Sequence, residues 1–550
     1  MKKLPLLPIL CATHLCAADY PYAIPGFNSA SVYTSAGADG TVLQYRKSKT
    51  EKWLPALNMV LSPDKKELRG SLFKLQENTR YEYRILHSGK TETGSFTTQS
   101  SYIPVIRTVV LDNQNFNGHL KLTESGTTSG YIRYTAAPGT VLQADFKHKE
   151  AILAENIKYV ILDGLTIRGG GHHIIHLKNC ENFRVVNCDL GNYGTPREPL
   201  DLSPSKNKEE GSRKLKFING KNINNQSPIE IRGGKNILIE RNFLHDPHGH
   251  ATPWFYTHPW GPSGIHYSKA TNLTIRWNDI IGSEHHRWND VIESLGNGSV
   301  DGGPYADAEI YGNYLAFCND DAIELDGGQK NIRFFGNRME GVFCGVSTAP
   351  CIEGPSYIIN NLLIHPGDEL GSTNAAIKNG GFTYYPGRIH IFNNTFCGPG
   401  TALSSYFNSE KVTPEQAKEL KSVVKNNLFI DCRPIHKGFW EVRNELNYNL
   451  YSGAAEHLSL YPSGQGLHDR EGDFAVNGKM ELVTPQTGAE LPNIGSRIGI
   501  SGELPERPLA LSVSAMSVNL SSTKLFATIT VKSNGYAGKL RTLQPEFSPF

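Results

Sequence analysis

The sequence predicts an all-β protein in which a long solenoid of short parallel strands follows a small β-sandwich. Two observations carry this prediction. A short apolar strand that ends in Asn recurs along much of the chain, and an earlier stretch, Tyr81–Ile85, alternates apolar and polar residues as antiparallel strands do. The 54 glycines, beside only 39% hydrophobic residues, are typical of a protein with many turns.

The chain has 550 residues, enough for two or three folding units. Its formal net charge is only +2, which gives no reason to expect nucleic acid or an anionic membrane as a partner. Beyond the first residues, no apolar stretch reaches the ~18 to 20 residues of a membrane-spanning helix. We therefore expect a monomer without a membrane span.

Residues 1–18 are typical of an export signal. Two lysines precede an apolar run from Leu4 to about Leu15, and small residues follow up to Ala18. Cleavage there would leave a mature chain that begins near Asp19. The expected location is therefore outside the cell or in the periplasm.

Seven cysteines follow the signal, an odd number without the spacing of a metal site. Cys344 and Cys351 could close a short loop through a disulfide bond. The others are expected as small core residues, because Cys is commonly buried.

Residues 27–98 are expected to form the sandwich. The segment Leu75–Ile85, followed by Phe96-Thr97-Thr98, resembles a fibronectin type III-like module. This resemblance implies a spacing or supporting role, and we assign no chemistry to the module.

From about residue 104 a recurring Asn ends short strands, and from Asn242 to Asn427 the intervals are 24 to 36 residues. One solenoid rung per interval fits this spacing, with the Asn side chain bonded to backbone at a tight turn. The recurring residues are Asn187, Asn242, Asn278, Asn313, Asn337, Asn361, Asn394 and Asn427. The pattern over residues 104–455 resembles the right-handed parallel β-helix of secreted polysaccharide-degrading enzymes. Residues 456–550 are expected to cap the solenoid and add a small β-unit.

Four carboxylates lie close together between Asn319 and Gly328. The alternation of apolar and charged residues in this stretch predicts a strand whose charged side chains point outward. Like charges this close repel one another, so we expect the stretch to serve a function. The carboxylates are Asp320 and Asp321 at the preceding turn, and Glu324 and Asp326 on the strand.

Aligning the rungs by phase places further strands in register with this one. The residue that follows the aliphatic one should face solvent on the same side in each rung, which would form a groove. This outward column consists of Glu230, His266, Glu293, Glu324, Ser347 and Lys378. Asp290 and Asp321 would take equivalent positions just before adjacent strands, and at rung spacing the carboxyls should lie ~5 to 10 Å apart.

Such a column suits glycosidic chemistry. An inverting hydrolase needs a carboxylic acid and a carboxylate base ~6.5 to 9.5 Å apart, and crowding would separate the pKa values of the two groups. We predict a glycoside hydrolase without a cofactor, acting on a polysaccharide or complex glycan. The general acid would be Asp321. The groups that activate water would be Asp290, Asp320 and Glu324. Glu293 and Asp326 would be supporting carboxylates.

Asn289-Asp290, followed a rung later by Asn319-Asp320-Asp321, resembles the acidic signature of polygalacturonase-type β-helix hydrolases. The resemblance implies that one of these aspartates is the acid and that two position water. The chain has Cys344-Gly345-Val346 where that family has Gly-His-Gly, and it lacks the Arg-Ile-Lys clamp, so pectin is not the expected substrate.

A second resemblance gives an alternative. Asp290, then Asp320-Asp321-x-x-Glu324, then Ala376-Ile377-Lys378 is similar to calcium-dependent β-helix polysaccharide lyases. It implies that the carboxylates hold Ca²⁺ and that Lys378 removes a proton beside a uronate carboxyl. Lys378 lies two rungs beyond Glu324, a distance that favours the hydrolase.

The segment His245–Pro262 is rich in histidine and aromatic residues. A zinc site is one interpretation, although no metal-binding spacing supports it. We expect instead a wall on which sugar rings stack. The residues expected to contact substrate are Trp254, Trp260, Arg287, His266, Arg232, Glu230 and Lys378. A third possibility is a non-catalytic solenoid that binds glycans, as tailspike-like or adhesive proteins do.

Overall fold

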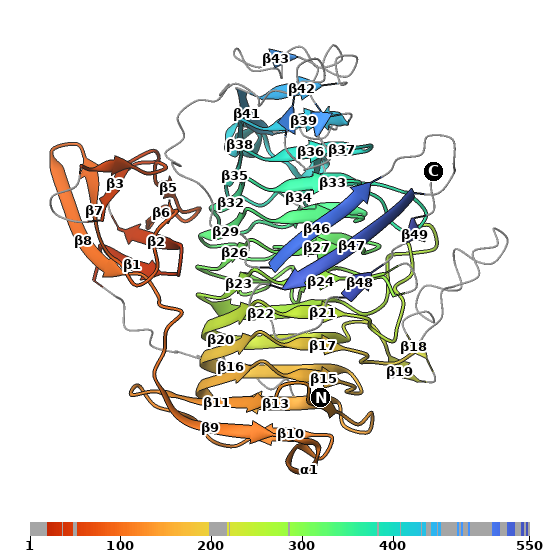
Figure 1. Cartoon of the computed structure of the whole chain (residues 1–550). Helices are drawn as coiled ribbons and strands as arrows, with labels where there is room; N and C mark the ends of the chain where they lie inside the picture. The colour runs from red at the N-terminus through yellow and green to blue at the C-terminus, as the bar shows by residue number, and fades with distance from the viewer. Residues whose placement is uncertain are drawn as a thin grey trace, which may run out of the picture.

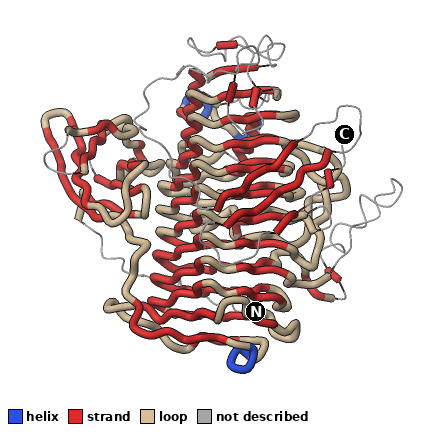
Figure 2. Tube along the Cα trace, viewed as in Figure 1, coloured by secondary structure: helices blue, strands red, loops and turns tan. Residues whose placement is uncertain are grey.

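The computed structural model describes residues 19–35, 37–47, 52–196, 217–218, 220–283, 286–381, 384–407, 409–430, 432–435, 442–447 and 449–452, and the strands between Arg470 and Phe547. It is a tall parallel β-helix with a small β-sandwich at its side (Figure 1). Strands and short turns make up nearly all of it (Figure 2). The predicted export signal, residues 1–18, lies outside the described residues.

The sandwich consists of two four-stranded antiparallel sheets, with the orders β1-β2-β6-β5 and β4-β3-β7-β8. Alternating apolar side chains of both sheets meet in one core, which includes Val32, Leu43, Leu72 and Ile85. The strands are β1 (Tyr22–Pro25), β2 (Ser29–Thr34), β3 (Val42–Arg46), β4 (Leu54–Pro55), β5 (Val60–Leu61), β6 (Leu68–Phe73), β7 (Arg80–His87) and β8 (Lys90–Thr97).

The solenoid has three faces, each a stack of parallel strands. A 21-stranded sheet folds around one corner and supplies the first and second faces, and a 12-stranded sheet supplies the third. The first face contains β10 (Leu120–Leu122), β13 (Glu150–Glu155), the first halves of β16 (His173–Val186) and β20 (Ser227–Glu240), β22 (Ile265–Thr271), β25 (Ile292–Ser294), β28 (Asp321–Glu324), β31 (Cys344–Thr348), β34 (Ala375–Gly380), β37 (Thr401–Tyr406) and β40 (Arg433–Ile435).

The second face also carries the second halves of β16 and β20. Its other strands are β9 (Val105–Leu111), β11 (Tyr131–Ala136), β14 (Lys158–Asp163), β23 (Thr274–Arg276), β26 (Glu309–Tyr311), β29 (Ile332–Phe335), β32 (Ser356–Ile359), β35 (Ile389–Phe392), β38 (Leu420–Lys425) and β41 (Arg443–Asn447).

The third face contains β12 (Val141–Gln143), β15 (Thr166–Arg168), β17 (Asp189–Gly191), β21 (Phe243–His245), β24 (Asp279–Ile281), β27 (Tyr314–Ala316), β30 (Arg338–Glu340), β33 (Leu362–Ile364), β36 (Thr395–Cys397), β39 (Leu428–Ile430), β42 (Leu450–Ser452) and β43 (Arg470–Glu471). Inward aliphatic and aromatic side chains of the three faces form one continuous core.

Elements outside these faces are short. The helices are α1 (Asn113–Phe116), η2 (Ser409–Lys411) and α2 (Pro414–Lys418), and a hairpin pairs β18 (Phe217–Ile218) with β19 (Lys221–Asn222). Near the C-terminus lie β44 (Ala475–Val476), β45 (Leu482–Val483), β46 (Leu509–Met516), β47 (Leu525–Ser533), β48 (Arg541–Leu543) and β49 (Glu546–Phe547). Within the described part of the chain, no helix has the length and apolar character needed to cross a membrane.

The predicted asparagine ladder is confirmed, and it holds the corner between the second and third faces. From Asn278 onward, each amide oxygen accepts from the backbone N–H and side-chain amide of the previous rung, as Asn313 Oδ1 does from Asn278 at 3.0 and 2.9 Å. The residue before each ladder position from Asn242 to Asn427 turns the chain in the left-handed region, as Trp277 does with φ of 58°. The buried ladder consists of Asn242, Asn278, Asn313, Asn337, Asn361, Asn394, Asn427 and Asn449.

Asn187 is not part of the ladder, which corrects the predicted phase of that rung. Asn187 is itself the turning residue, with φ of 57°, and Cys188 takes the ladder position. The backbone N–H of Cys188 donates to Asn242 Oδ1 at 3.0 Å. The expected loop closure is also wrong, because Cys344 and Cys351 are both free thiols.

The sandwich packs against the outside of the second face. Phe73 contacts Tyr357 and Phe335 edge-on, with ring centroids 5.4 and 5.9 Å away. The buried Glu309 carboxylate accepts hydrogen bonds from the backbone N–H of Phe27 at 2.6 Å and the hydroxyl of Ser29 at 2.6 Å. Apolar packing and buried polar bonds together fix the sandwich on the solenoid.

Replacing one ladder residue tests how much the ladder contributes. Asn313→Ala should destabilise the protein by at least about 3 kcal/mol, because buried donors and acceptors on both neighbouring rungs lose their partner. Urea denaturation followed by circular dichroism measures this. The control Gln143→Ala removes an exposed amide and should change stability by less than about 0.5 kcal/mol. Equal effects of the two substitutions would contradict a structural role for the ladder.

Candidate functional site

The predicted outward column is confirmed by the strand register of the first face. Glu230 pairs with His266, and His266 pairs with Glu293. Pairing of Ile292 with Ile323 sets Glu293 beside Glu324. The column then continues from Glu324 to Ser347 and from Ser347 to Lys378.

The expectation that this whole column faces solvent is wrong. Glu230, His266 and Ser347 have no exposed surface, whereas Glu293, Glu324 and Lys378 are partly exposed. The column points away from the apolar core, but long connections that enter the first face lie against it. Phase alignment gives the direction of a side chain and does not show what covers it.

Three carboxylates form the centre of the site. One oxygen each from Asp290, Asp321 and Glu324 lie within 4.8 Å of one another. Asp290 Oδ1 accepts from the backbone N–H of Asp321 at 2.9 Å, so the two aspartates occupy equivalent positions on adjacent rungs, as expected. Glu324 Oε2 accepts from Ser294 N and Asn297 Nδ2, each at 3.2 Å.

Electrostatic crowding keeps several of these groups protonated. Burial, with Glu324 and Asp320 nearby, raises the pKa of Asp290 well above its usual range. Burial, with Asp326 and Asp321 nearby, raises the pKa of Glu324 in the same way. Burial raises the pKa of Asp326 to about 6, even though Lys378 opposes the shift and Ser347 donates to the carboxylate.

Asp320 lies beneath Trp254, one of the aromatic residues predicted to form a wall for sugar rings. Trp254 Nε1 donates to Asp320 Oδ1 at 2.9 Å, and the indole stacks on Phe343 with centroids 5.9 Å apart. Burial and the neighbouring Asp321 raise the pKa of Asp320 to about 8. Because 39% of Trp254 is exposed, its ring is open to a ligand above the carboxylates.

Glu293 has the opposite electrostatic environment. Burial favours its neutral form, but His266, Ser263 and Asn289 together lower the pKa of its carboxyl below the usual value. His266 Nε2 lies 3.0 Å from Glu293 Oε2, and the Ser263 hydroxyl donates to the same oxygen at 2.5 Å. The pKa values of Glu293 and Glu324 are therefore shifted in opposite directions.

Lys378 reaches the carboxylates, which corrects the expectation that it lies too far away. Its Nζ donates to Asp321 Oδ2 at 2.6 Å. The intervening rung carries the small Ser347, so the long lysine side chain can extend over it. Burial alone would lower the pKa of Lys378. The neighbouring Asp321, Cys344 and Asp320 outweigh that effect and raise the pKa of Lys378 well above its usual value.

Three residues predicted to contact substrate are buried and bonded to other parts of the protein. Arg287 is buried, and its Nη1 donates to the carbonyl oxygens of Cys318, Gly341 and Gly367 at 3.2, 2.9 and 3.3 Å. Its position inside these loops contradicts the expected contact with substrate. Glu230 and His266 are also buried, since Glu230 bonds to side chains of its own rung and the preceding one and His266 supports Glu293.

The remaining predicted contacts keep some surface. Arg232 leaves 52% of its side chain exposed and pairs with Glu230, and Trp260 is half-buried beside the His258 ring. His285, part of the zinc interpretation, lies outside the described residues. His248 stacks on Phe146 and His250 Nε2 pairs with Glu369 at 2.8 Å, so these histidines do not converge on a metal.

Sequence reasoning missed the residues that hold the loops in place. Asn319 Nδ2 donates to Ala251 O at 2.9 Å and to Glu369 Oε1 at 3.0 Å, which joins three connections over the site. An Asn directly before a candidate catalytic aspartate was the available signal. The same signal marked Asn289, which with Ser263 lowers the pKa of Glu293, whereas Ser263 gave no signal of its own.

The donor atoms of the acidic centre are of the kind that a calcium ion binds. Asp290, Asp321 and Glu324 present only carboxylate oxygens, the donors that Ca²⁺ prefers, and the buried Asp321 Oδ1 has no hydrogen-bond partner. These three residues would hold the ion.

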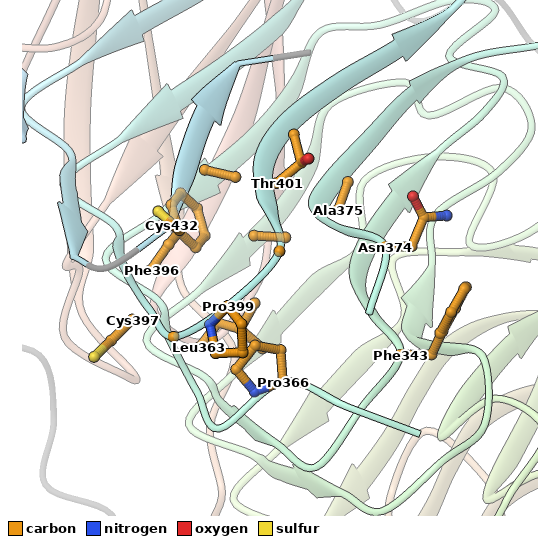
Figure 3. A pocket seen from close by; sticks show the side chains of 14 residues that line it. Phe343, Leu363, Pro366, Asn374, Ala375, Phe396, Cys397, Pro399, Thr401 and Cys432 are labelled. Atoms are coloured by element: carbon orange, nitrogen blue, oxygen red, sulfur yellow. The ribbon is translucent and has the colours of Figure 1, made fainter. Parts of the chain in front are cut away.

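A small apolar hollow opens beside the site (Figure 3). Phe343, which stacks on Trp254, lines one side, and Pro399 and Phe396 lie on the other. Ala375 and Ala376, on the strand that carries Lys378, complete it. It extends the aromatic wall past the carboxylates.

A family model described as "Right handed beta helix region" matches residues 150–363. The chain folds as a right-handed parallel β-helix. The matched region includes all six acidic residues of the site, and Lys378 follows it. No curated protein matches this sequence.

Solved structures with the same fold are distant. A tailspike protein of E. coli bacteriophage HK620 is 10% identical, with a TM-score of 0.32 over 68% of this chain and 70% of that one. DFA-IIIase from Arthrobacter chlorophenolicus A6 is 10% identical, with a TM-score of 0.25 over 60% of this chain and 63% of that one. The tailspike gp49 of Pseudomonas phage LKA1 is 9% identical, with a TM-score of 0.26 over 76% and 65%. Likenesses this distant do not identify an activity.

The raised pKa of Asp320 predicts a pH dependence of stability. The folded pKa of about 8 lies above the ordinary value of 3.8, so between these values the native state holds a proton that the unfolded state has lost. This stabilisation is complete below pH 4 and is lost as the pH rises through 8. Asp320→Asn should therefore reduce the decline in the urea midpoint between pH 5 and pH 8, measured in EDTA. The exposed control Asp301→Asn should leave the decline unchanged, and an unchanged decline in Asp320→Asn would refute the assignment.

Proposed function

We propose that this protein cleaves glycosidic bonds as a glycoside hydrolase in the groove along its first face. The observation that carries the proposal is the pair Glu293 and Glu324, which are adjacent on neighbouring rungs and have pKa values shifted in opposite directions. Glycoside hydrolysis needs one carboxylic acid and one carboxylate at the scissile bond. Both side chains are partly exposed, unlike Asp290, Asp320 and Asp321.

In this mechanism Glu324 donates its proton to the leaving glycosidic oxygen. Glu293, held ionised by His266 and Ser263, acts on the anomeric carbon or on a water beside it. Asp321, which the sequence suggested as the acid, is fully buried and bound to Lys378, so it supports the charge balance instead. Trp254 offers an exposed ring on which a sugar can stack.

The spacing of the pair bears on stereochemistry. Adjacent rungs lie ~4.8 Å apart, close to the ~5 to 5.5 Å of a retaining pair and below the ~6.5 to 9.5 Å of an inverting one. We therefore favour retention, in which Glu293 is the nucleophile, over the inversion expected from the sequence. The export signal expected at residues 1–18 would place this activity outside the cytoplasm.

A calcium-dependent lyase is the second candidate, favoured by the contact between Lys378 and the cluster of Asp290, Asp321 and Glu324. When bound there, Ca²⁺ would neutralise a uronate carboxyl and make the proton beside it more acidic. Lys378 carries a raised pKa beside Asp321, so it is protonated and cannot act as a base in this state. This charge state is why we place the hydrolase first.

The two reactions leave different products. Purified protein should be incubated with a panel of polysaccharides, with and without EDTA, while reducing ends and the ultraviolet absorbance of an unsaturated sugar are followed. A hydrolase gives reducing ends without absorbance and is indifferent to EDTA. Absorbance that EDTA abolishes would establish the lyase. Binding to a glycan of the panel without either product would favour the non-catalytic solenoid.

On the substrate found, Glu324→Gln and Glu293→Gln should each lower kcat by about 10²- to 10⁴-fold, because each removes a proton donor or a carboxylate from the reacting bond. Glu155→Gln, an exposed glutamate on the same face, is the matched control and should keep full activity. Retention is checked by NMR of the first anomer released. Full activity of Glu324→Gln would exclude it as the acid.

A further inference from the structure

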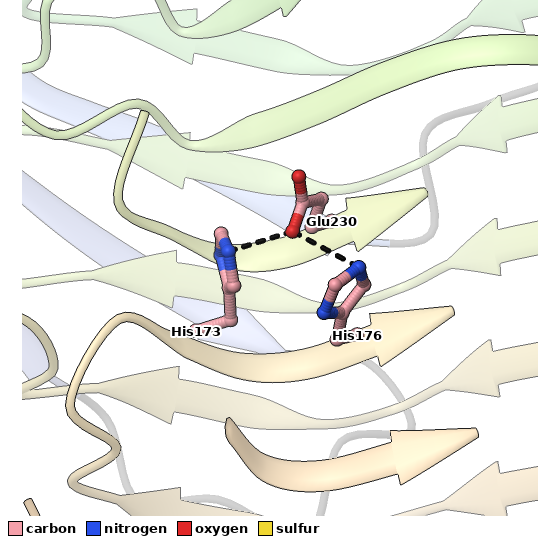
Figure 4. Close-up of side chains that lie close together, drawn as sticks. All are labelled: His173, His176 and Glu230. Carbon is pink, nitrogen blue, oxygen red and sulfur yellow. Dashed lines mark ion pairs between the residues drawn. The ribbon is translucent and has the colours of Figure 1, made fainter. Parts of the chain in front are cut away.

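A second cluster of ligating side chains lies on the first face, away from the carboxylates. His173 and His176 project from β16, and Glu230 projects from β20, the next rung (Figure 4). Glu230 is two rungs before Glu293 in the outward column. All three side chains are at most 1% exposed.

The alternation of side chains is interrupted on β16, which puts both histidines on one side. Residues three apart on a regular strand point to opposite faces. Here the consecutive residues Ile174 and Ile175 both pack in the apolar core. His173 and His176, which flank this pair, therefore approach the same glutamate.

The three ligand atoms converge on one point. His173 Nε2 and His176 Nε2 lie 2.6 and 3.1 Å from Glu230 Oε2. One nitrogen or oxygen of each residue lies within 4.8 Å of the others. His172 Nδ1, 2.8 Å from His173 Nε2, is a further imidazole nitrogen at the same place.

The other ring nitrogens already have acceptors. His173 Nδ1 lies 3.1 Å from the hydroxyl oxygen of Ser227, whose proton goes to Ile229 O, and 3.3 Å from Ser227 O. His176 Nδ1 lies 2.9 Å from Glu150 Oε1. His176 lowers the pKa of Glu150, so this carboxylate can only accept. Both imidazoles therefore carry their proton on Nδ1.

With both protons on Nδ1, no proton lies between the Nε2 atoms of the two histidines and the Glu230 carboxylate. The lone pairs of His173 Nε2 and His176 Nε2 face the Glu230 carboxylate, and His176 Nε2 and Glu230 Oε2 have no hydrogen-bond donor. Two imidazole lone pairs and a carboxylate oxygen aimed at one buried point match the needs of a cation.

We propose that His173, His176 and Glu230 bind a divalent transition-metal ion of the zinc class. Two imidazoles and one carboxylate form a donor set that suits Zn²⁺ and differs from the all-oxygen sets that suit Ca²⁺. Ligand atoms of a tetrahedral zinc site lie about 3.4 Å apart, so the cluster needs to open by less than about 1 Å. The site is independent of the proposed hydrolase and of the calcium alternative.

The surroundings resemble those of established metal sites. A metal-bound histidine usually donates its second N–H to a carboxylate or backbone carbonyl, as His176 does to Glu150 and His173 to Ser227. Glu230 Oε1 accepts from Arg232 Nε at 2.5 Å, which leaves Oε2 for the ion. The exposed Arg232 and half-buried His172 lie between the cluster and solvent, so an ion has a way in.

The test is metal content and titration of the full-length mature protein. After stripping with chelator and dialysis against equimolar Zn²⁺, elemental analysis should find one zinc per chain. Titration with Co²⁺ should give the visible absorption of a tetrahedral site. His176→Gln and Glu230→Gln should each weaken binding at least tenfold, whereas the exposed-ring control His148→Gln should bind as the parent does.

Two further results separate this site from others. Zn²⁺ should raise the Tm of the parent and of Glu324→Gln, but not of His173→Gln, and this readout also shows that each variant folds. Loss of zinc from Glu324→Gln would move the metal to the acidic cluster and overturn the proposal. So would a parent that binds neither Zn²⁺ nor Co²⁺ at micromolar concentrations, with ¹⁵N chemical shifts showing His176 as an imidazolium.

Discussion

The in-register stacking of parallel rungs is the constraint on which the rest of the structure depends. Buried amides from Asn242 to Asn449 pass hydrogen bonds from rung to rung at one corner. Once that register is fixed, a residue on the first face lies beside the equivalent residue of the next rung. The Asp290 carboxylate therefore accepts a hydrogen bond from the backbone N–H of Asp321, which is 31 residues away in sequence. The site follows from the periodicity of the fold.

Stacking charged groups in a covered column creates an electrostatic conflict that the protein resolves by location. At the acidic centre, Lys378 pairs with Asp321, and burial among other carboxylates raises the pKa values of Asp290 and Glu324 well above their usual range. Glu293 remains ionised, because His266 and neighbouring donors surround it. Two rungs before Glu293, the buried carboxylate of Glu230 also needs a partner, and there the imidazoles of His173 and His176 lie beside it. The acidic centre and the surroundings of Glu230 therefore each contain neighbouring groups that differ in their affinity for protons or cations.

The sequence predicted what repeats and missed what does not. The strand-Asn period gave the solenoid and the order of the outward column, because both depend on local pattern and register. Burial of Glu230, His266 and Arg287 was missed, since irregular connections cover them and have no period. The reach of Lys378 was missed because counting rungs ignores side-chain length over the small Ser347. His173 and His176 lie on one side because the consecutive Ile174 and Ile175 both pack in the core, which no regular alternation predicts.

The sandwich packs on the rungs that carry the site. Its Phe73 belongs to a cluster with aromatic residues of β26, β29, β32 and β35 on the second face, and with Trp277 directly after β23. These strands belong to the same rungs as β22, β25, β28, β31 and β34, which carry the site on the first face. Buried ion pairs such as Arg276 with Glu77 hold the two parts in one orientation. These contacts fix the outer side of the same rungs. The carboxylate pair proposed as catalytic depends on the spacing of those rungs.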